Sequence, residues 1–359
     1  MPDVDVVIAG AGIAGACAAL ALAADRSVHI VEADRPAAGA SGAAAGLVNP
    51  LMGRKAKAVW QIDEALGAFE AVLETAEADS LFRPGGVLRP TVEDKQVSFF
   101  QDAVDRHPEF ATWLPADVVR ERFPDVRTAG GALHIPRGGA VDVPALVEAM
   151  LDAARDRNAT VDTGVCVTGW EETGNAIRVH TESADGAPVT ITAGHLLLAV
   201  GQGFPAFDAL TGLGLYGVKG QTLRVRRPDG LGPLLPMSGR GYIVPNGDTL
   251  VLGSSYQHDF DDLSPSNDAT QYIQQKTAQM LPGVDTACVL DVQVGVRVYA
   301  PHSNLPIVGP LPDHARCWAF TALGSKGLLT APRIADALPR YLAAPEQIPP
   351  ALQVPDPAS

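Results

Sequence analysis

Three glycines and one acidic residue near the N-terminus have the types and spacing that bind a dinucleotide. Gly10, Gly12 and Gly15 form a G-x-G-x-x-G motif after the apolar run 4–8, and Glu32 ends the next apolar run. Gly10 permits a tight turn, Gly12 lets the backbone approach a pyrophosphate, and Gly15 lets a helix pack closely on the strand. The helix N-terminus then offers unpaired N–H groups to the phosphates, and the carboxylate at 32 can accept hydrogen bonds from a ribose.

Two more glycine-rich segments indicate a cofactor larger than a nicotinamide dinucleotide. The run 37–47 consists of small residues, and we expect its backbone to pass close to a second part of the cofactor, as flavin enzymes often require. The segment 324–328 is a glycine-bracketed turn that opens a helix. Its N–H groups and dipole can stabilise negative charge on the N1–C2=O edge of a reduced flavin.

Arg297, Tyr242 and Lys326 are the candidates for contact with a substrate or with the reacting atoms. Arg297 lies in the otherwise apolar strand 292–298, where an unpaired charge facing the core would be costly. A bidentate clamp on a substrate carboxylate removes that cost, and the alternative is an arginine on the solvent face of an edge strand. The Tyr242 hydroxyl has the same two interpretations. Lys326 either adds positive charge beside the flavin or lies in solvent.

The sequence shows no spacing that indicates a metal site or a disulfide framework. The four cysteines are scattered, without a C-x-x-C pair, and the eight histidines are equally dispersed. We expect buried free thiols in a reducing compartment. Residues 6–24 carry no charge, but their glycines and alanines argue against a membrane span, and no basic segment marks a signal peptide. The prediction is a cytoplasmic protein without membrane contact.

The formal net charge of −14 disfavours extended binding to nucleic acid, which needs clustered Lys and Arg. Two local groups are exceptions. They comprise Arg54, Lys55 and Lys57, and then Lys219, Arg224, Arg226 and Arg227. They are either solvated loop and strand faces or a small basic patch on an acidic body.

The elements that must position these residues alternate between α/β and β-rich character. Helices are expected at 14–24, 59–79, 144–157 (with Asp142 as N-cap), 267–281 and after the 323–328 segment to about 343. Strands are expected at 4–8, 28–31, 160–170, 176–181, 195–201, 221–225, 241–245, 249–254, 289–298 and 317–322, with a strand pair at 81–92 and a hairpin turn at 246–248. At 359 residues the chain exceeds one ordinary core, so two interwoven domains are predicted.

The chain resembles the D-amino-acid oxidase superfamily of flavoproteins over nearly its whole length. The resemblance rests on the glycine motif with Glu32, the 40–47 loop, the segments 242–245 and 251–254, Gly295-Val296-Arg297, and the closing 324–328 turn. Within this superfamily it is most similar to the FAD oxidase domain of the MnmC family of bifunctional tRNA-modifying enzymes, through the segments 49–52, 259–263 and 323–332. It departs from that family in its strongly acidic charge and in lacking a methyltransferase half.

The resemblance implies an α/β fold with an FAD-binding Rossmann-like domain of the glutathione-reductase type and an inserted β-rich α+β substrate domain. The FAD-binding domain would comprise 1–55, 140–215 and 300–345, the substrate domain 56–139 and 216–299, and 346–359 would be a frayed tail. Non-covalent FAD would be bound by Gly10, Ala11, Gly12, Ile13, Ala14, Gly15, Glu32, Ala33, Ala40, Ser41, Ala45, Gly46, Leu47, Val167, Ala199, Val200, Gly201, Gly324, Ser325, Lys326, Gly327 and Leu328.

The implied reaction is oxidation of a carboxymethyl amine by hydride transfer to FAD, followed by imine hydrolysis and reoxidation of the flavin by dioxygen. The substrate would be the carboxymethylaminomethyl-uridine at the tRNA wobble position, or a free amine or amino acid such as glycine, sarcosine or a D-amino acid. Two further alternatives are a nicotinamide dehydrogenase and a non-catalytic flavin-binding partner protein. The oligomeric state stays open.

Overall fold

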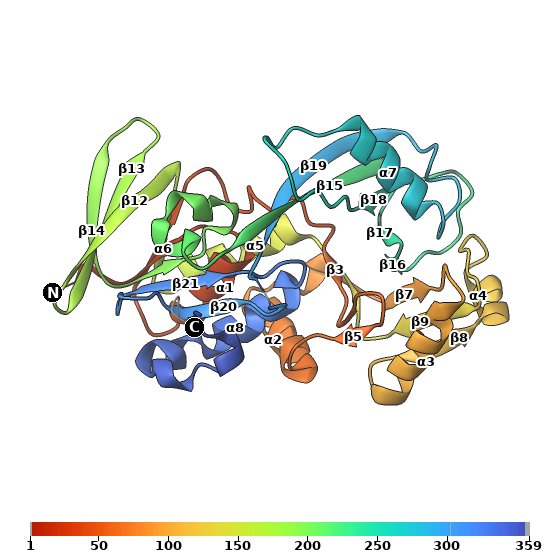
Figure 1. The fold of residues 1–359 in the computed structure, drawn as a ribbon, viewed down its shortest axis with the longest axis horizontal. Helices are drawn as coiled ribbons and strands as arrows, with labels where there is room; N and C mark the ends of the chain where they lie inside the picture. Colours follow the sequence, from red (N-terminus) through yellow and green to blue (C-terminus); the bar gives the residue numbers. More distant parts are fainter. Residues whose placement is uncertain (1, 302, 356–359) are drawn as a thin grey trace.

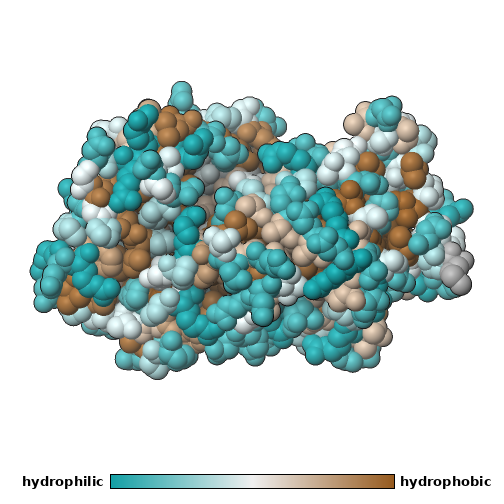
Figure 2. Space-filling view, turned by 180° about the vertical axis from the view of Figure 1, so that it is seen from behind, coloured by the Kyte–Doolittle hydropathy of each residue, from teal (hydrophilic) through white to brown (hydrophobic). Residues whose placement is uncertain are grey.

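The computed structural model describes residues 2–301 and 303–355 of the chain. Two large sheets of eight strands each form the centres of two lobes, joined by several crossings of the chain (Figure 1). The arrangement confirms the expected α/β class. Seen from behind, the surface is mostly hydrophilic with hydrophobic residues in small groups (Figure 2). Within the described residues, no helix is both long and apolar enough to cross a membrane.

The first sheet carries the glycine motif. Its strands lie in the order β11 (Ala159–Thr163), β2 (Val28–Glu32), β1 (Val4–Ala9), β14 (Pro188–Leu198), β13 (Ala176–Ser183) and β12 (Val165–Thr173), and β21 (Cys317–Thr321) pairs with both β14 and β20 (Ile307–Pro310). The β1 strand is parallel to both β2 and β14, with Ala9 opposite Val31 and Leu198. The carboxyl ends of these strands therefore meet at one edge, where ligands of open α/β sheets bind.

Four helices of the first lobe pack on its sheet or on one another. The helices α1 (Ile13–Leu22) and α5 (Val143–Arg155) pack on the first sheet, α8 (Gly327–Ala343) packs on α1, and α2 (Ile62–Thr75) packs on α8 and α5. Asp142 caps α5 as expected, because its carboxylate accepts a hydrogen bond from Ala145 N at 3.1 Å. Leu66 and Phe69 are among the buried residues of α2, and this helix packs on α8 and α5 of the first lobe. This packing places α2 on the first lobe, although the predicted boundary at residue 56 assigned it to the other one. The remaining domain boundaries stay predictions.

The second sheet combines segments from 87–135 and 216–299. Its order is β19 (Val289–Tyr299), β15 (Tyr216–Arg226), β18 (Thr249–Gly253), β17 (Gly241–Asn246), β16 (Met237–Gly239), β7 (Val87–Pro90), β9 (Gly131–Ile135) and β8 (Thr112–Pro115), with α3 (Lys95–Arg106), α4 (Ala116–Arg122) and α7 (Asn267–Thr277) packed on it. The antiparallel pairing of β17 with β18 confirms the hairpin turn at 246–248. The β19 strand lies at the sheet edge, next to the first lobe (Figure 1).

The prediction that two strands within 81–92 pair with each other is wrong. Both strands exist, but β6 (Phe82–Pro84) pairs with β10 (Gly139–Val141), which also pairs with β3 (Leu47–Val48), whereas β7 belongs to the second sheet. Gly85 and Gly86 both have positive φ, at 133° and 95°, and direct the chain from one sheet to the other. The smaller elements are β4 (Leu51–Met52), β5 (Lys57–Ala58) and α6 (Asp208–Thr211).

The frayed tail expected at 346–359 is also wrong for the residues that the structure describes. Short 3-10 turns at Pro345–Gln347 and Pro350–Leu352 bury Ile348 and Leu352 in the core of the first lobe. The proline-rich composition suggested a loose tail. The tail is ordered instead because Ile348 and Leu352 pack into the hydrophobic core of the first lobe. Residues 356–359 of that prediction lie outside the described residues.

Candidate flavin and substrate site

The glycine motif forms a tight turn at the carboxyl edge of the first sheet. Gly10 has φ +102°, and a Cβ atom there would lie 2.6 Å from the carbonyl oxygen of Ala199. A Cβ atom on Gly15 would lie 1.8 Å from the carbonyl oxygen of Gly10. Both positions therefore exclude a side chain, because backbone atoms occupy the space. This contact also brings the predicted 199–201 segment, at the end of β14, beside the motif.

The Glu32 carboxylate stabilises this turn by accepting two backbone hydrogen bonds. Its Oε2 accepts a hydrogen bond from Ala11 N at 2.7 Å, and its Oε1 accepts one from Asp34 N at 3.0 Å. Each carboxylate oxygen has a further lone pair, so the group can also accept from a ribose hydroxyl. Sequence reasoning predicted only the contact with the ribose.

The 37–47 loop lies between the start of α1 and the second sheet. Ser41 Oγ accepts a hydrogen bond from Ile13 N at 3.0 Å, and the Thr222 hydroxyl of β15 donates to Ala43 O at 3.2 Å. A Cβ atom on Gly295 of β19 would lie 2.8 Å from the Cα of Ala40. The loop is thus held by both lobes, with little free space on the side of the second sheet.

The starts of α1 and α8 lie beside each other. A Cβ atom on Gly327 would come within 3.2 Å of the Ile13 side chain. Neither N-cap residue, Gly12 for α1 or Lys326 for α8, accepts a helix N–H with its own side chain. Apart from Ile13 N, which donates to Ser41 Oγ, the first-turn N–H groups of the two adjacent helix starts are available to an anionic ligand and suit the pyrophosphate and the flavin edge of FAD. The residues present therefore fit this cofactor.

The 324–328 turn is packed against β19. Gly324 has φ +53°, and a Cβ atom there would lie 2.4 Å from the ring of Tyr299. The hydroxyls of Tyr299 and Ser325 lie 2.9 Å apart. The Lys326 ammonium donates to the carbonyl of Asn304 at 2.7 Å, and burial lowers the pKa of this lysine. In this structure the lysine charge is thus bound to a neighbouring loop.

Arg297 lies on β19 between Gly295, which packs on the 37–47 loop, and Tyr299, which packs on the 324–328 turn. Gly295, Arg297 and Tyr299 occupy alternate positions and so face the same side of the strand. The half-buried guanidinium donates to Ser254 Oγ at 3.2 Å and to Ser255 O at 2.9 Å. Within the described residues, no carboxylate lies within 4.0 Å of it. A partly desolvated cation with only neutral acceptors is suited to binding an anionic ligand.

Tyr242 lies next to this guanidinium. It faces Gly253 across the β17–β18 pair, and its ring covers the position that a side chain at 253 would occupy. Burial raises the pKa of Tyr242, while the charge of Arg297 acts in the opposite direction. The phenol therefore stays neutral and keeps its proton for donation at physiological pH.

The other predicted cofactor residues extend the same segments or lie at the margin. The start of α1 contains Gly12 as N-cap, followed by Ile13 and Ala14, and the start of α8 contains Gly327 and Leu328. The 37–47 loop ends with Ala45, Gly46 and Leu47, and β14 is followed by Val200 and Gly201. Ala33 is exposed directly after β2. Val167 on β12 packs at the edge of the cluster that contains Ala9 and Val31.

Sequence reasoning missed the roles of Ser254, Tyr256 and Tyr299. The Arg297 guanidinium lies 4.1 Å from the centre of the Tyr256 ring, and Tyr299 contacts Gly324 and Ser325. The alternation of strand residues 295, 297 and 299 could have indicated Tyr299. Nothing in the local pattern indicated Tyr256, because it lies 41 positions from Arg297 in the sequence.

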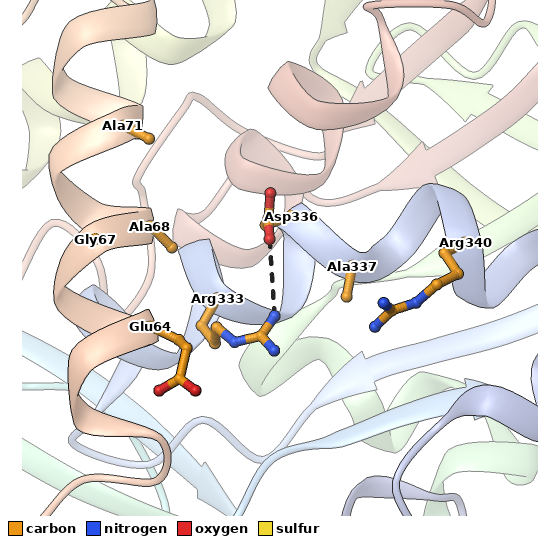
Figure 3. A pocket seen from close by; sticks show the side chains of 8 residues that line it. All are labelled: Glu64, Gly67, Ala68, Ala71, Arg333, Asp336, Ala337 and Arg340. Carbon is orange, nitrogen blue, oxygen red and sulfur yellow. Dashed lines mark ion pairs between the residues drawn. The ribbon is translucent and has the colours of Figure 1, made fainter.

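Two further features lie outside this site. A groove of about 460 Å³ lies between α2 and α8, with an Arg333–Asp336 ion pair at 3.7 Å and none of the predicted site residues in its lining (Figure 3). Among the described residues, no group of three His, Cys, Asp or Glu side chains is arranged to hold a metal.

A glycine turn at the carboxyl ends of parallel strands, two adjacent helix starts and an unpaired arginine nearby are the arrangement expected of a dinucleotide-dependent oxidoreductase. The chain belongs to the DAO family of FAD-dependent oxidoreductases, whose model matches residues 5–339. It is therefore an FAD enzyme that acts on the C–N bond of amines or amino acids. The nicotinamide dehydrogenase and the non-catalytic flavin-binding protein are thereby excluded.

Three relatives illustrate the similarity, with 23–29% identity over the aligned residues. It is 26% identical over 351 residues to the uncharacterized oxidoreductase YurR of Bacillus subtilis, with 91% of each chain covered. It is 29% identical over 335 residues to the tRNA 5-methylaminomethyl-2-thiouridine biosynthesis bifunctional protein MnmC of Burkholderia multivorans, covering 87% of this chain and 49% of that protein. The chain thus spans about half the length of that relative. Its fold matches glycine oxidase from Geobacillus kaustophilus with a TM-score of 0.82, 23% identity and 95% of each chain covered.

Proposed function

We propose that the chain oxidises a carboxymethyl amine, R–NH–CH2–COO⁻, at the bond between nitrogen and the methylene carbon. The observation that carries this proposal is the guanidinium of Arg297. It is half-buried, has only neutral hydrogen-bond partners in the described structure, and lies two residues from the tyrosine that contacts the 324–328 turn. An arginine in this position suits a small substrate that brings its own carboxylate to the flavin.

Arg297 and Tyr242 are proposed to hold the carboxylate, by a charged pair of N–H donors and by a neutral phenol. Fixing this end of the substrate orients its methylene carbon for reaction, which removes much of the entropic cost of the encounter. The bound FAD supplies the acceptor for the hydride, and dioxygen reoxidises it. The imine that leaves the site is hydrolysed by water. Exclusion of water from the site favours the neutral amine, which is the form that can release hydride.

The finer proposal is that R contains the uridine of a tRNA wobble position. The likeness to the tRNA-modifying relative supports it. The basic residues give it limited support, because Lys219 is buried and donates to Ser264 O, and Arg227 donates to the carbonyls of Leu231 and Gly232. Arg54, Lys55, Lys57, Arg224 and Arg226 remain exposed. A free amine such as glycine or sarcosine is the second candidate, favoured by the net charge of −14.

One preparation of the FAD-loaded protein decides between the two. Peroxide release is followed with glycine, sarcosine and D-amino acids, and nucleosides from tRNA that carries the carboxymethylaminomethyl group are analysed by mass spectrometry before and after incubation. Loss of the carboxymethyl group from the tRNA supports the finer proposal. Turnover of free amino acids with unchanged tRNA would reject it, and no oxidation of any of these substrates would reject the carboxymethyl-amine proposal itself.

A further inference from the structure

Two exposed tyrosines and a lysine lie just outside Arg297. Tyr256 is 53% exposed and Tyr272 is 48% exposed. The Lys276 ammonium lies 5.5 Å from the centre of the Tyr256 ring and 4.9 Å from that of Tyr272. Since Arg297 itself stacks on Tyr256 at 4.1 Å, these residues continue outward from the guanidinium. We call Tyr256, Tyr272 and Lys276 the tyrosine–lysine strip.

The fold holds the strip in place. Tyr272 and Lys276 are four residues apart on α7 and therefore lie on the same face of the helix. The start of α7 is fixed to β15, because Gln221 donates to the Thr270 hydroxyl at 2.7 Å and accepts from Ser266 N at 2.9 Å. The Tyr256 segment is tied to the same strand through the isolated bridge between Lys219 and Gln257. A surface that is ordered before a ligand arrives loses less entropy on binding.

We propose that the strip is an outer subsite that binds a single planar heterocycle in the R group of the substrate. This inference rests on the proposed function, because it assumes that the carboxylate end is bound at Arg297. The tyrosine rings offer faces for stacking, and the lysine, a flexible point charge, can move aside and donate to an oxygen of the ring or to a phosphate. The likeness to the tRNA-modifying relative favours a pyrimidine nucleoside as this heterocycle, either free or part of an RNA chain.

The surrounding charges favour one nucleoside over an extended nucleic-acid track. Asp268 lies in the first turn of α7, and the preceding segment contains Asp259, Asp261 and Asp262. Only the last of these faces a cation in the described structure, with its Oδ1 3.6 Å from the Lys219 ammonium. The carboxylates of these adjoining segments would repel a long polyanion, whereas a single base with its own sugar stacks without that cost.

The test compares two substrates that share the carboxymethyl amine but differ in the ring. Sarcosine has no ring, and 5-carboxymethylaminomethyluridine has one; tRNA that carries the same modified base forms a third arm. We expect Tyr272→Ala to lower the ratio of kcat/KM for the nucleoside to kcat/KM for sarcosine by about 10- to 100-fold, the range for loss of one stacked base. Tyr272→Phe keeps the ring and should keep the ratio. Leu290→Ala, at an exposed apolar residue of β19 outside the strip, is the control variant.

Equilibrium dialysis of the nucleoside against the FAD-loaded protein gives a second readout that does not need turnover. Weaker nucleoside binding in Tyr272→Ala supports the subsite even if no substrate is oxidised, an outcome that would reject the proposed function alone. An unchanged ratio together with unchanged nucleoside binding overturns the subsite while sarcosine oxidation can still stand. If Tyr272→Ala lowers kcat/KM for the free nucleoside but leaves kcat/KM for the modified tRNA unchanged, the strip serves a free nucleoside.

Discussion

The hydroxyl of Tyr299 lies 2.9 Å from the hydroxyl of Ser325, across the junction between the two lobes. Tyr299 belongs to the edge strand of the second sheet, and Ser325 lies in the turn that opens α8 on the first lobe. Arg297 lies two residues before this contact, and Gly295 two residues earlier still packs on the 37–47 loop. One strand face thus connects the proposed carboxylate site with two segments of the proposed cofactor site.

Replacing Arg297 with Met should raise KM for the carboxylate substrate and lower kcat/KM by about 30- to 1000-fold, because a charge-assisted pair of hydrogen bonds contributes roughly 2–4 kcal/mol. Steady-state peroxide assays measure this, and the flavin spectrum should stay unchanged. Arg224→Met is the matched control, since Arg224 is an exposed arginine of the same sheet, 3.8 Å from Asp291. Equal kinetics for the two variants would place Arg297 outside the site.

Gly324→Ala should weaken FAD binding by about tenfold or more. The positive φ of +53° alone costs an L-residue about 1–2 kcal/mol, and the added methyl would displace the ring of Tyr299 and with it the turn at the α8 start. Gly174→Ala has a similar φ of +58° with no atom within 4 Å, so it carries the backbone cost without the displacement. Titration of the apoprotein with FAD measures both variants, and a similar affinity in the two would argue against a role for the turn.

The same substitution should have opposite effects on stability at two helical glycines. Gly15→Ala should lower the free energy of unfolding by about 1–3 kcal/mol or more, because its methyl would meet the carbonyl oxygen of Gly10. Gly67→Ala, on an exposed position of α2 with no atom within 4 Å, should raise it by about 0.5–1 kcal/mol. Urea unfolding of the two apoproteins gives both values. A tolerated alanine at 15 would contradict the close helix–strand packing.

FAD should be released from the protein by acid precipitation, because its attachment is expected to be non-covalent. The cysteine nearest in sequence to the 324–328 turn is Cys317, which is fully buried in β21. Burial also raises the pKa of the Cys317 thiol, with Glu172 adding to the effect, so the reactive thiolate is disfavoured. The measurement is the flavin absorbance of the supernatant and of the washed pellet. Yellow colour that stays in the pellet would show a covalent link.

The sequence alone determined the features that depend on neighbours along the chain. The glycine motif, the acid at 32, the Asp142 cap and the hairpin turn at 246–248 are each set by a few consecutive residues, whose steric and hydrogen-bonding preferences act locally. The strand at 4–8 was expected for a similar reason, because a short apolar run favours an extended conformation. The α/β class followed from the order of such segments, as did the likeness to flavin oxidases.

Only the tertiary structure decided which distant surfaces meet. It separated the strands at 81–92 into two sheets, buried Ile348 and Leu352 of the tail, and turned Lys219 inward to the carbonyl of Ser264. It also placed Tyr256 on Arg297. Composition suggested a strand pair and a frayed tail, and it left a basic patch as one of two interpretations, because each segment was considered alone. The position of each segment depends instead on long-range packing. An apolar side chain packs where the folded chain provides a core, and a charged side chain turns inward where the folded chain provides a hydrogen-bond partner.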